Sequence, residues 1–223
     1  IESDDIELFS RKRNLVPVLS IEGGRTTTDA RRGAGVYDKL LEKMHALNEN
    51  AVLYGASVTV NRANLGEAVS EEFLDALKAL GCRLVFYIEY VPVDASEKDL
   101  AFTEADRSHF DEKRRVLGLK YPGMVFLAFP GDEKKLGGCL AAGRGFFHIN
   151  PDGSAEPCPF SPYSDMDLRK SSFTEVLRSP LFKKLCENGL IGGKHDGGCA
   201  LFERDAEVRA ALSGTAGTAN REK

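Results

Sequence analysis

The sequence predicts an α/β protein: a partial (β/α) barrel at residues 1–132, followed by a small domain of a cysteine-containing β-hairpin and helices at residues 133–212. Two observations predict this division. Short apolar runs alternate with helix-periodic segments as far as residue 129, which is the pattern of parallel βαβ units. Four of the five cysteines follow residue 132, in a region rich in Gly and Pro. Residues 213–223 are small and polar, so a disordered tail is expected there.

The predicted strands are four apolar, largely β-branched runs, at residues 15–21, 52–60, 83–91 and 124–129. The first is apolar almost throughout, as expected of a strand that is covered on both faces and has neighbours on both sides. Four βα units are too few to close a barrel. We therefore expect the missing partner strands upstream of Ile1, in a longer chain.

Each of the first three strands is followed by a predicted helix. Residues 36–47 place apolar side chains at a spacing of 3.6 residues, and Ser70 is a predicted N-cap for a helix over 70–80. Thr103 opens the third helix, with Asp106 at the capping-box position. Strands alternating with helices predict a parallel sheet.

The C-terminal region begins with a predicted hairpin. Strands at 146–149 and 154–156 flank the turn sequence Asn150-Pro151-Asp152-Gly153. Two short helices follow, the first capped by Ser172 and the second starting at Ser179-Pro180, where Pro occupies the first helical position.

Composition excludes several classes of protein. The 30 Lys and Arg against 34 Asp and Glu give a net charge of −4, which argues against a nucleic-acid partner. No run reaches the roughly 20 apolar residues that span a bilayer, so no membrane association is expected. Residues 1–7 are acidic and lack the layout of a signal peptide. Together these features predict a cytoplasmic location.

The cysteines are the strongest chemical signal. Cys139 and Cys158 flank the predicted hairpin, which can bring them together, and Cys199 follows two glycines that permit close backbone approach. Thiols in a small loop-rich unit of a cytosolic protein suggest a metal or iron–sulfur site rather than disulfides. The alternative is that these are buried apolar side chains. For Cys186, on an apolar helical stripe, the two readings are equally balanced, and Cys82 is expected to be a packing residue.

These residues resemble a known family. The spacing Cys139-x13-Gly153-x4-Cys158 with a later Cys resembles the SPASM/Twitch auxiliary-cluster domain of radical S-adenosylmethionine (SAM) enzymes. Upstream, the strand end Ser20-Ile21-Glu22-Gly23, the stretch 28–33 (TDARRG) and the run 54–60 (YGASVTV) are similar to barrel segments of these enzymes. The resemblance covers residues 14–212 and implies a partial barrel of the radical SAM type.

The sequence departs from the family in two ways. It lacks the Cys-x3-Cys-x2-Cys loop that holds the SAM-cleaving [4Fe–4S] cluster, and it lacks the Gly-Gly-Glu strand end that binds the SAM amino group. It also has too few cysteines for a complete SPASM domain, so the shorter Twitch-like form with one auxiliary cluster fits better. This chain alone is therefore not expected to cleave SAM.

The resemblance implies roles for particular residues. Ser20 and Thr59 would hydrogen-bond the ribose or methionine part of SAM, and Glu22 could assist. Glu89 is the candidate catalytic residue, because a carboxylate in an apolar strand must face a cavity or be paired with a helix Lys or Arg. The implied ligands of an auxiliary [4Fe–4S] cluster are Cys139, Cys158 and Cys199, with Cys186 as a further candidate. His148 and His195 are weaker candidates for completing that site.

We therefore expect the C-terminal portion of a radical SAM enzyme. The intact enzyme would bind SAM and a second [4Fe–4S] cluster and would modify a peptide or small molecule, with an electron-donor protein as a possible partner. Whether this portion is itself an enzyme is left open. Two alternatives remain: a non-catalytic module in which the same thiolates hold structural Zn²⁺, and a degenerate radical SAM-like protein that keeps the fold only for interaction.

Overall fold

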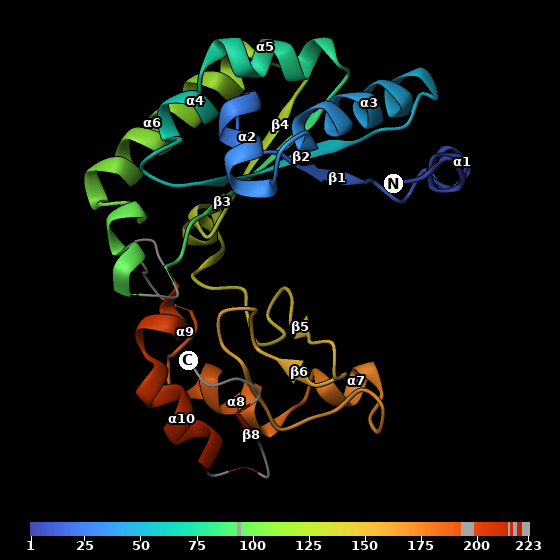
Figure 1. Cartoon of the computed structure of the whole chain (residues 1–223). Helices are drawn as coiled ribbons and strands as arrows, with labels where there is room; N and C mark the ends of the chain where they lie inside the picture. The colour runs from blue at the N-terminus through green and yellow to red at the C-terminus, as the bar shows by residue number, and fades with distance from the viewer. Residues whose placement is uncertain (93–94, 193–198, 214, 216–217, 220–223) are drawn as a thin grey trace. The chain divides into compact units, whose positions relative to one another are not determined.

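The computed structural model describes residues 1–92, 95–192, 199–213, 215 and 218–219 of the chain. These residues form two compact units, Ile1–Phe129 and Pro130–Lys223, with separate hydrophobic cores. Helices and strands of both units are labelled in Figure 1.

Unit 1 is built on a four-stranded parallel sheet with strand order β1-β2-β3-β4. Its elements in chain order are α1 (Ser3–Arg11), β1 (Val18–Ser20), α2 (Arg25–Arg32), α3 (Val36–Glu49), β2 (Gly55–Val60), α4 (Leu65–Ala68), α5 (Glu71–Ala79), β3 (Leu84–Glu89), the 3-10 helix η1 (Ala95–Leu100), α6 (Glu104–Lys120) and β4 (Val125–Phe129). The predicted α/β class with a parallel sheet is confirmed. The described part of the chain contains no closed barrel.

Local sequence explains where the helices of unit 1 begin. Ser70 accepts a hydrogen bond from the N–H of Phe73 at 3.2 Å and caps α5. Thr103 and Asp106 form a reciprocal capping box at the start of α6. Both caps satisfy backbone N–H groups that have no partner within the helix. The short helix α2, at the stretch 25–32, was not predicted.

The two faces of the sheet differ. Helices α2 to α6 lie on one face (Figure 1), where they bury alternate residues of the strands, such as Val85 and Tyr87 of β3. Tyr87 packs edge-on against Phe110 of α6, with ring centroids 5.2 Å apart. The opposite face, which we call the open face, carries the other residues of each strand. It includes the exposed Val125 and Leu127 of β4. A polar residue on the open face is therefore not enclosed by the helices of unit 1.

Strand β1 differs from its prediction. It is shorter than the predicted run 15–21 and lies at an edge of the four-stranded sheet. Leu15, Val16 and Val18 are exposed, whereas Leu19 is buried in the core of unit 1. The apolar run is thus covered on one face only, because the helices of this unit pack on a single side of the sheet.

Unit 2 consists of short elements joined by loops. In chain order they are the 3-10 helix η2 (Gly131–Leu136), β5 (His148–Ile149), β6 (Ala155–Glu156), β7 (Tyr163–Ser164), α7 (Phe173–Val176), α8 (Pro180–Glu187), α9 (Ala200–Glu203), α10 (Asp205–Ser213) and β8 (Thr218–Ala219). The sequence places the β5–β6 hairpin correctly, although its strands are shorter than predicted. The Asn150 side chain accepts hydrogen bonds from the N–H groups of Asp152 and Ser154, each at 3.0 Å, and Gly153 has φ +84°. These features explain the tight turn.

Two described parts of the predicted tail, residues 213–223, have regular structure. Ser213 is the last residue of α10, and Thr218–Ala219 form β8, which pairs antiparallel with β7. Residues 214, 216–217 and 220–223 lie outside the described part. Within the described ranges, every helix is too short or too polar to cross a bilayer.

Candidate functional site

The first group of predicted site residues lies at the carboxyl ends of β1 and β2. Ser20 is in register with Ser57, and Thr59 follows two positions later on the same strand face. All three are half-buried and lie on the open face, because their strand neighbours Leu19 and Val58 are buried toward the helices. In parallel sheets this edge is where ligands bind. Three hydroxyls therefore line a place suited to a polar ligand.

Glu22 lies just beyond β1 and is only 1% exposed. Its Oε1 accepts a hydrogen bond from Nη2 of Arg32 at 2.5 Å, and Nε of Arg31 lies 3.4 Å from the same oxygen. Its Oε2 accepts from the backbone N–H of Thr59 at 3.2 Å. The carboxylate thus ties together the end of β1, helix α2 and strand β2. Its charge is compensated by arginines of unit 1. Glu22 therefore serves to position these elements.

Asn64 completes this network and was missed by the sequence analysis. Its side-chain N–H2 donates to the backbone oxygens of Glu22, at 3.0 Å, and of Thr59, at 2.9 Å. Its Oδ1 accepts from the N–H of Asn61 at 2.8 Å. A buried amide that bridges two strand ends fixes their separation. Ser57 was also missed, although alternation along a strand places it on the same face as Thr59.

Glu89 ends β3 and shares a strand face with Tyr87, toward helix α6. Its Oε1 accepts a hydrogen bond from Nε of Arg107 at 2.8 Å. Of the two alternatives for this carboxylate, the structure has the pairing with a helix cation. This contact and its side of the sheet separate Glu89 from the hydroxyls on the open face.

The second group is formed by cysteines of unit 2. Cys139 is 7% exposed and Cys158 is 2% exposed, and both belong to the core of this unit, with Cys199 packed against it. The loop after Cys139 is held beside Cys158 by a hydrogen bond from the N–H of Ala142 to the oxygen of Pro157 at 3.0 Å. All are free thiols. The fold therefore brings three cysteines, far apart in sequence, into one apolar core.

The three thiols interact electrostatically. A hydrogen bond with Cys199 raises the pKa of Cys158, and burial raises it further, whereas the same hydrogen bond lowers the pKa of Cys199. Burial raises the pKa of Cys139 to about 12, and the charge of Cys199 adds to this rise. The pKa values of Cys158 and Cys199 therefore shift in opposite directions. A cation bound between these thiols would favour the thiolate form of each.

The donor set suits a soft metal or an iron–sulfur cluster, which are bound by thiolates. Backbone N–H groups act on each sulfur and lower its pKa: Ala141 on Cys139, Phe160 on Cys158, and Phe202 and Leu201 on Cys199. Such hydrogen bonds favour the thiolate form that binds metal. As they stand, the described His, Cys, Asp and Glu side chains include no group of three arranged to hold a metal ion.

The remaining ligand candidates are placed differently. Cys186 is exposed on α8, and the charged groups that act on its pKa are Arg144 and Glu187 rather than the other thiols. His148 lies in β5 with its Nε2 3.9 Å from an oxygen of Glu156. His195 lies outside the described residues. Of the four predicted cysteine ligands, three therefore share one apolar core and Cys186 lies outside it.

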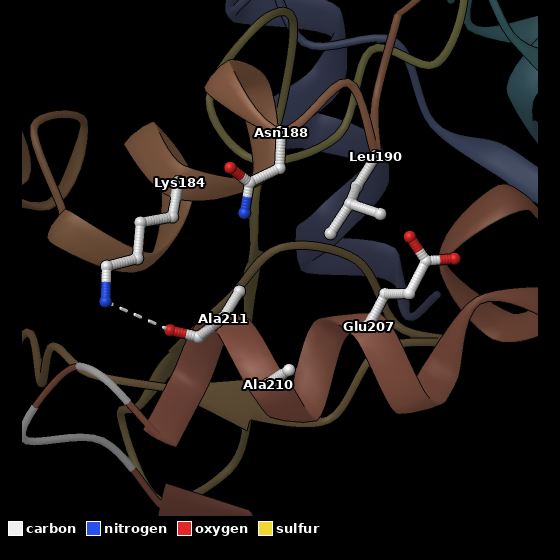
Figure 2. A pocket seen from close by; sticks show the side chains of 6 residues that line it. All are labelled: Lys184, Asn188, Leu190, Glu207, Ala210 and Ala211. Atoms are coloured by element: carbon white, nitrogen blue, oxygen red, sulfur yellow. Dashed lines mark hydrogen bonds between the residues drawn. The ribbon is translucent and has the colours of Figure 1, made fainter.

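Unit 2 also has a surface pocket of about 480 Å³ between α8 and α10 (Figure 2). At one side Lys184 donates to the backbone oxygen of Ala211 at 3.3 Å, and at the other Glu207 presents its carboxylate toward Leu190. The lining residues are Lys184, Asn188, Leu190, Glu207, Ala210 and Ala211. None of the predicted site residues is among them.

Solved structures with a similar fold are radical SAM enzymes. SuiB from Streptococcus suis aligns with 84% of this chain and 49% of its own length, at 13% identity and a TM-score of 0.65. SuiB bound to the precursor peptide SuiA aligns with 82% of this chain and 46% of its own, at 14% identity and a TM-score of 0.62. The protein anSMEcpe with bound AdoMet and Cp18Cys peptide aligns with 80% of this chain and 55% of its own, at 13% identity and a TM-score of 0.62.

Other comparisons give no match: the sequence fits no protein-family model, and no curated protein resembles it. The chain spans about half the length of the solved proteins that it matches. At these identities the likeness concerns the fold. The chain has the fold of the corresponding portion of these radical SAM enzymes.

Proposed function

We propose that this chain is a portion of a radical SAM enzyme, in which residues 1–132 contribute strands of the barrel and residues 133–212 form a Twitch-like auxiliary domain. The observation that carries the proposal is the burial of Cys139 and Cys158 in one apolar core, with Cys199 packed against it. It occurs in a chain whose fold matches that of radical SAM enzymes over four fifths of its length.

In this proposal Cys139, Cys158 and Cys199 hold an auxiliary [4Fe–4S] cluster. Three thiolates in an apolar core give iron its preferred soft ligands, and backbone N–H groups beside the sulfurs stabilise their negative charge. The bound cluster would supply electron transfer or a substrate-binding iron. Cys186 is not needed as a ligand, since it is exposed and interacts with Arg144 and Glu187.

Ser20 and Thr59 bind SAM in this proposal, at the carboxyl ends of β1 and β2. Their hydroxyls, with that of Ser57, lie on the open face and can donate to and accept from a ribose or a carboxylate. Glu22 acts on the site as a positioning residue, because it accepts from the N–H of Thr59 and pairs with Arg32. SAM would supply the radical chemistry together with a further [4Fe–4S] cluster, and that cluster would be held elsewhere in the enzyme.

The substrate class we favour is a peptide, with a small molecule as the alternative. SuiB and anSMEcpe are both solved with bound peptides, the precursor SuiA and Cp18Cys. An electron-donor protein would be the expected partner, because the proposed chemistry consumes electrons. The peptide assignment rests on the likeness of fold to these two proteins.

The test is anaerobic reconstitution of the full chain with ferrous iron and sulfide. About four irons and four sulfides per chain are expected, with the broad visible absorption of iron–sulfur clusters. Cys158→Ala should abolish this loading. Cys82→Ala is the matched control, because Cys82 is a buried cysteine in the core of unit 1, and Cys186→Ala is a second control. Both controls should load as the unaltered chain does.

Three results would contradict the proposal. Full loading of Cys158→Ala would show that this thiol is not a ligand. Equal losses in Cys158→Ala and Cys82→Ala would indicate non-specific iron binding. Stoichiometric binding of Zn²⁺ without any iron–sulfur absorption would favour a structural zinc module instead.

A further inference from the structure

The pocket between α8 and α10 has the size of a small-ligand site. Its volume is about 480 Å³, and pockets that bind small ligands enclose roughly 300–1,000 Å³. Lys184 and Asn188 line it from the C-terminal end of α8, where a spacing of four residues places both side chains on one face. Opposite them, α10 contributes Ala210 and Ala211, whose short side chains leave the space open (Figure 2).

One wall of this pocket is apolar. Leu190 and Ala211 are buried members of the core of unit 2, and Ala210 lies beside Ala211 on α10. The apolar core of the unit therefore reaches the surface at this point. An aliphatic group of a ligand that packs here would be removed from water, which favours binding.

A cation lies at one end of the pocket. The ammonium of Lys184 donates to the backbone oxygen of Ala211 at 3.3 Å, and this uses one of its three N–H donors. Among the described residues, no carboxylate forms an ion pair with Lys184, whereas the neighbouring Lys183 pairs with Glu187 at 3.7 Å. Two donors of a charged group are therefore available for an anionic ligand.

The carboxylate at the other end of the pocket is already paired. The two oxygens of Glu207 accept hydrogen bonds from Nε and Nη2 of Arg204, at 2.8 and 2.6 Å. The third nitrogen of this guanidinium donates to the backbone oxygen of Gly189 at 2.9 Å, which fixes its position. Because Arg204 compensates Glu207, the charge that remains at the pocket is that of Lys184. The pocket therefore favours an anionic ligand over a cationic one.

The side-chain amide of Asn188 adds a more specific feature. Figure 2 shows this amide directed toward α10, and it makes no hydrogen bond with the described residues. An Asn side chain offers both N–H donors and an oxygen acceptor. A peptide group offers one of each, so the two are complementary. A peptide group next to a carboxylate is the chemistry of a peptide C-terminus.

We infer that this pocket binds the C-terminus of a peptide whose last residue is aliphatic. The terminal carboxylate accepts hydrogen bonds from Lys184, the last peptide group pairs with the amide of Asn188, and the aliphatic side chain packs against Leu190 and the alanines of α10. This adds to the proposed function a site for one end of a peptide. It does not require that the cysteines hold a cluster, because none of them lines the pocket.

The test is isothermal titration calorimetry of the full chain with three probes. They are N-acetyl-alanyl-leucine, the same dipeptide with a C-terminal amide, and 4-methylpentanoate, which has a carboxylate and an aliphatic group but no peptide group. The dipeptide acid should bind about tenfold more tightly than its amide, because the amide loses the charged contact with Lys184. It should also bind more tightly than 4-methylpentanoate, which cannot pair with Asn188.

Matched variants assign the binding to this pocket. Lys184→Gln should abolish the preference for the acid over the amide, and Lys184→Arg, which keeps a cation, should retain it. Lys183→Gln removes the same charge from the adjacent residue of α8, outside the pocket, and should leave all three affinities unchanged. Ala210→Leu should fill the pocket and prevent binding. Its control is Ala206→Leu, because Ala206 is also exposed on α10 but does not line the pocket.

Several results would overturn the inference. Equal affinities for the acid and the amide, or no binding of any probe, would show that the pocket does not recognise a terminal carboxylate. Equal losses in Lys183→Gln and Lys184→Gln would indicate a general attraction of charge. If 4-methylpentanoate binds as tightly as the dipeptide acid, the pocket recognises small carboxylates and not a peptide end. Iron loading is measured separately, so a chain that binds the dipeptide acid but forms no cluster keeps this inference and loses the proposed function.

Discussion

The two units of this chain are stabilised in different ways. Unit 1 encloses aliphatic and aromatic side chains between a parallel sheet and its helices, and many of its core residues are fully buried. Unit 2 has described strands of two residues each, and two of its core residues are the cysteines Cys139 and Cys158. Apolar packing can stabilise the first. The second, with little regular structure, is expected to depend on a bound inorganic centre.

Removal of that centre should produce the largest difference between the units. Structural metals contribute about 10 kcal/mol to the folding of small domains. We expect the amide of Leu181, in the core of unit 2, to exchange its hydrogen far faster after chelation than in the loaded protein. The amide of Leu74, in the core of unit 1, should exchange at an unchanged rate. Hydrogen exchange followed by mass spectrometry measures the exchange rates of both amides. Equal acceleration at Leu181 and Leu74 would contradict the proposed difference between the two units.

A matched pair of core substitutions sharpens the same contrast. Leu74 in unit 1 and Leu185 in unit 2 are both fully buried. Truncation to Ala removes buried methyl groups and leaves a cavity, at a cost of about 2–5 kcal/mol. We expect Leu74→Ala to lower the free energy of unfolding of unit 1 without unfolding it. Leu185→Ala should unfold unit 2 when the centre is absent.

Urea unfolding of the two variants, with and without the reconstituted centre, measures these effects. The proposed difference is contradicted if unit 2 of Leu185→Ala, without the centre, unfolds in urea as cooperatively as unit 1. It also fails if loading rescues Leu74→Ala to the same extent as Leu185→Ala, because the centre would then not act on unit 2 specifically.

The sequence predicts the two units unequally well, for physical reasons. The strands and long helices of unit 1 have periodic apolar residues and local caps such as Ser70 and Thr103, so their positions follow from nearby residues. The hairpin turn at Asn150 is likewise a local signal. The packing of Cys199 against the core that holds Cys158 joins segments 41 residues apart. Thiols in a loop-rich unit and the family resemblance suggested that the two come together, but no local pattern predicts how. The partners of Glu22 and Glu89 depend on tertiary packing in the same way.

Missed residues have the same explanation. Asn64 bridges Glu22 and Thr59 because a turn directs its amide back to two strand ends, and no spacing rule predicts that direction. Such polar contacts are set by the fold and become visible once the backbone is placed.

The smallest expected difference concerns two surface carboxylates. Asp167 in unit 2 has a pKa lowered to about 2, mainly by hydrogen bonds from the side chain of Arg169. Asp106 in unit 1 has a pKa lowered mainly by a hydrogen bond from the side chain of Thr103, with Arg62 contributing less. The first shift therefore depends on a cation and the second on a helix cap. Added salt should raise the pKa of Asp167 more than that of Asp106, because salt screens charge pairs.

The sign of the pH effect follows from these directions. A carboxylate whose folded pKa is below its unfolded value, about 3.9 for Asp, contributes stability at pH values above that value. For Asp167 this contribution is lost as the pH falls toward 2. Arg169→Ala should raise the titration midpoint of Asp167, and Thr103→Val should raise that of Asp106. Both rises should be partial, because the backbone N–H of residue 169 still donates to Asp167 and that of residue 103 to Asp106. NMR titration of the side-chain carboxyl carbons, at low and high salt, measures the midpoints of Asp167 and Asp106 in the unaltered chain and in the two variants. Equal salt responses of the two carboxylates would show that the cation and the cap act alike.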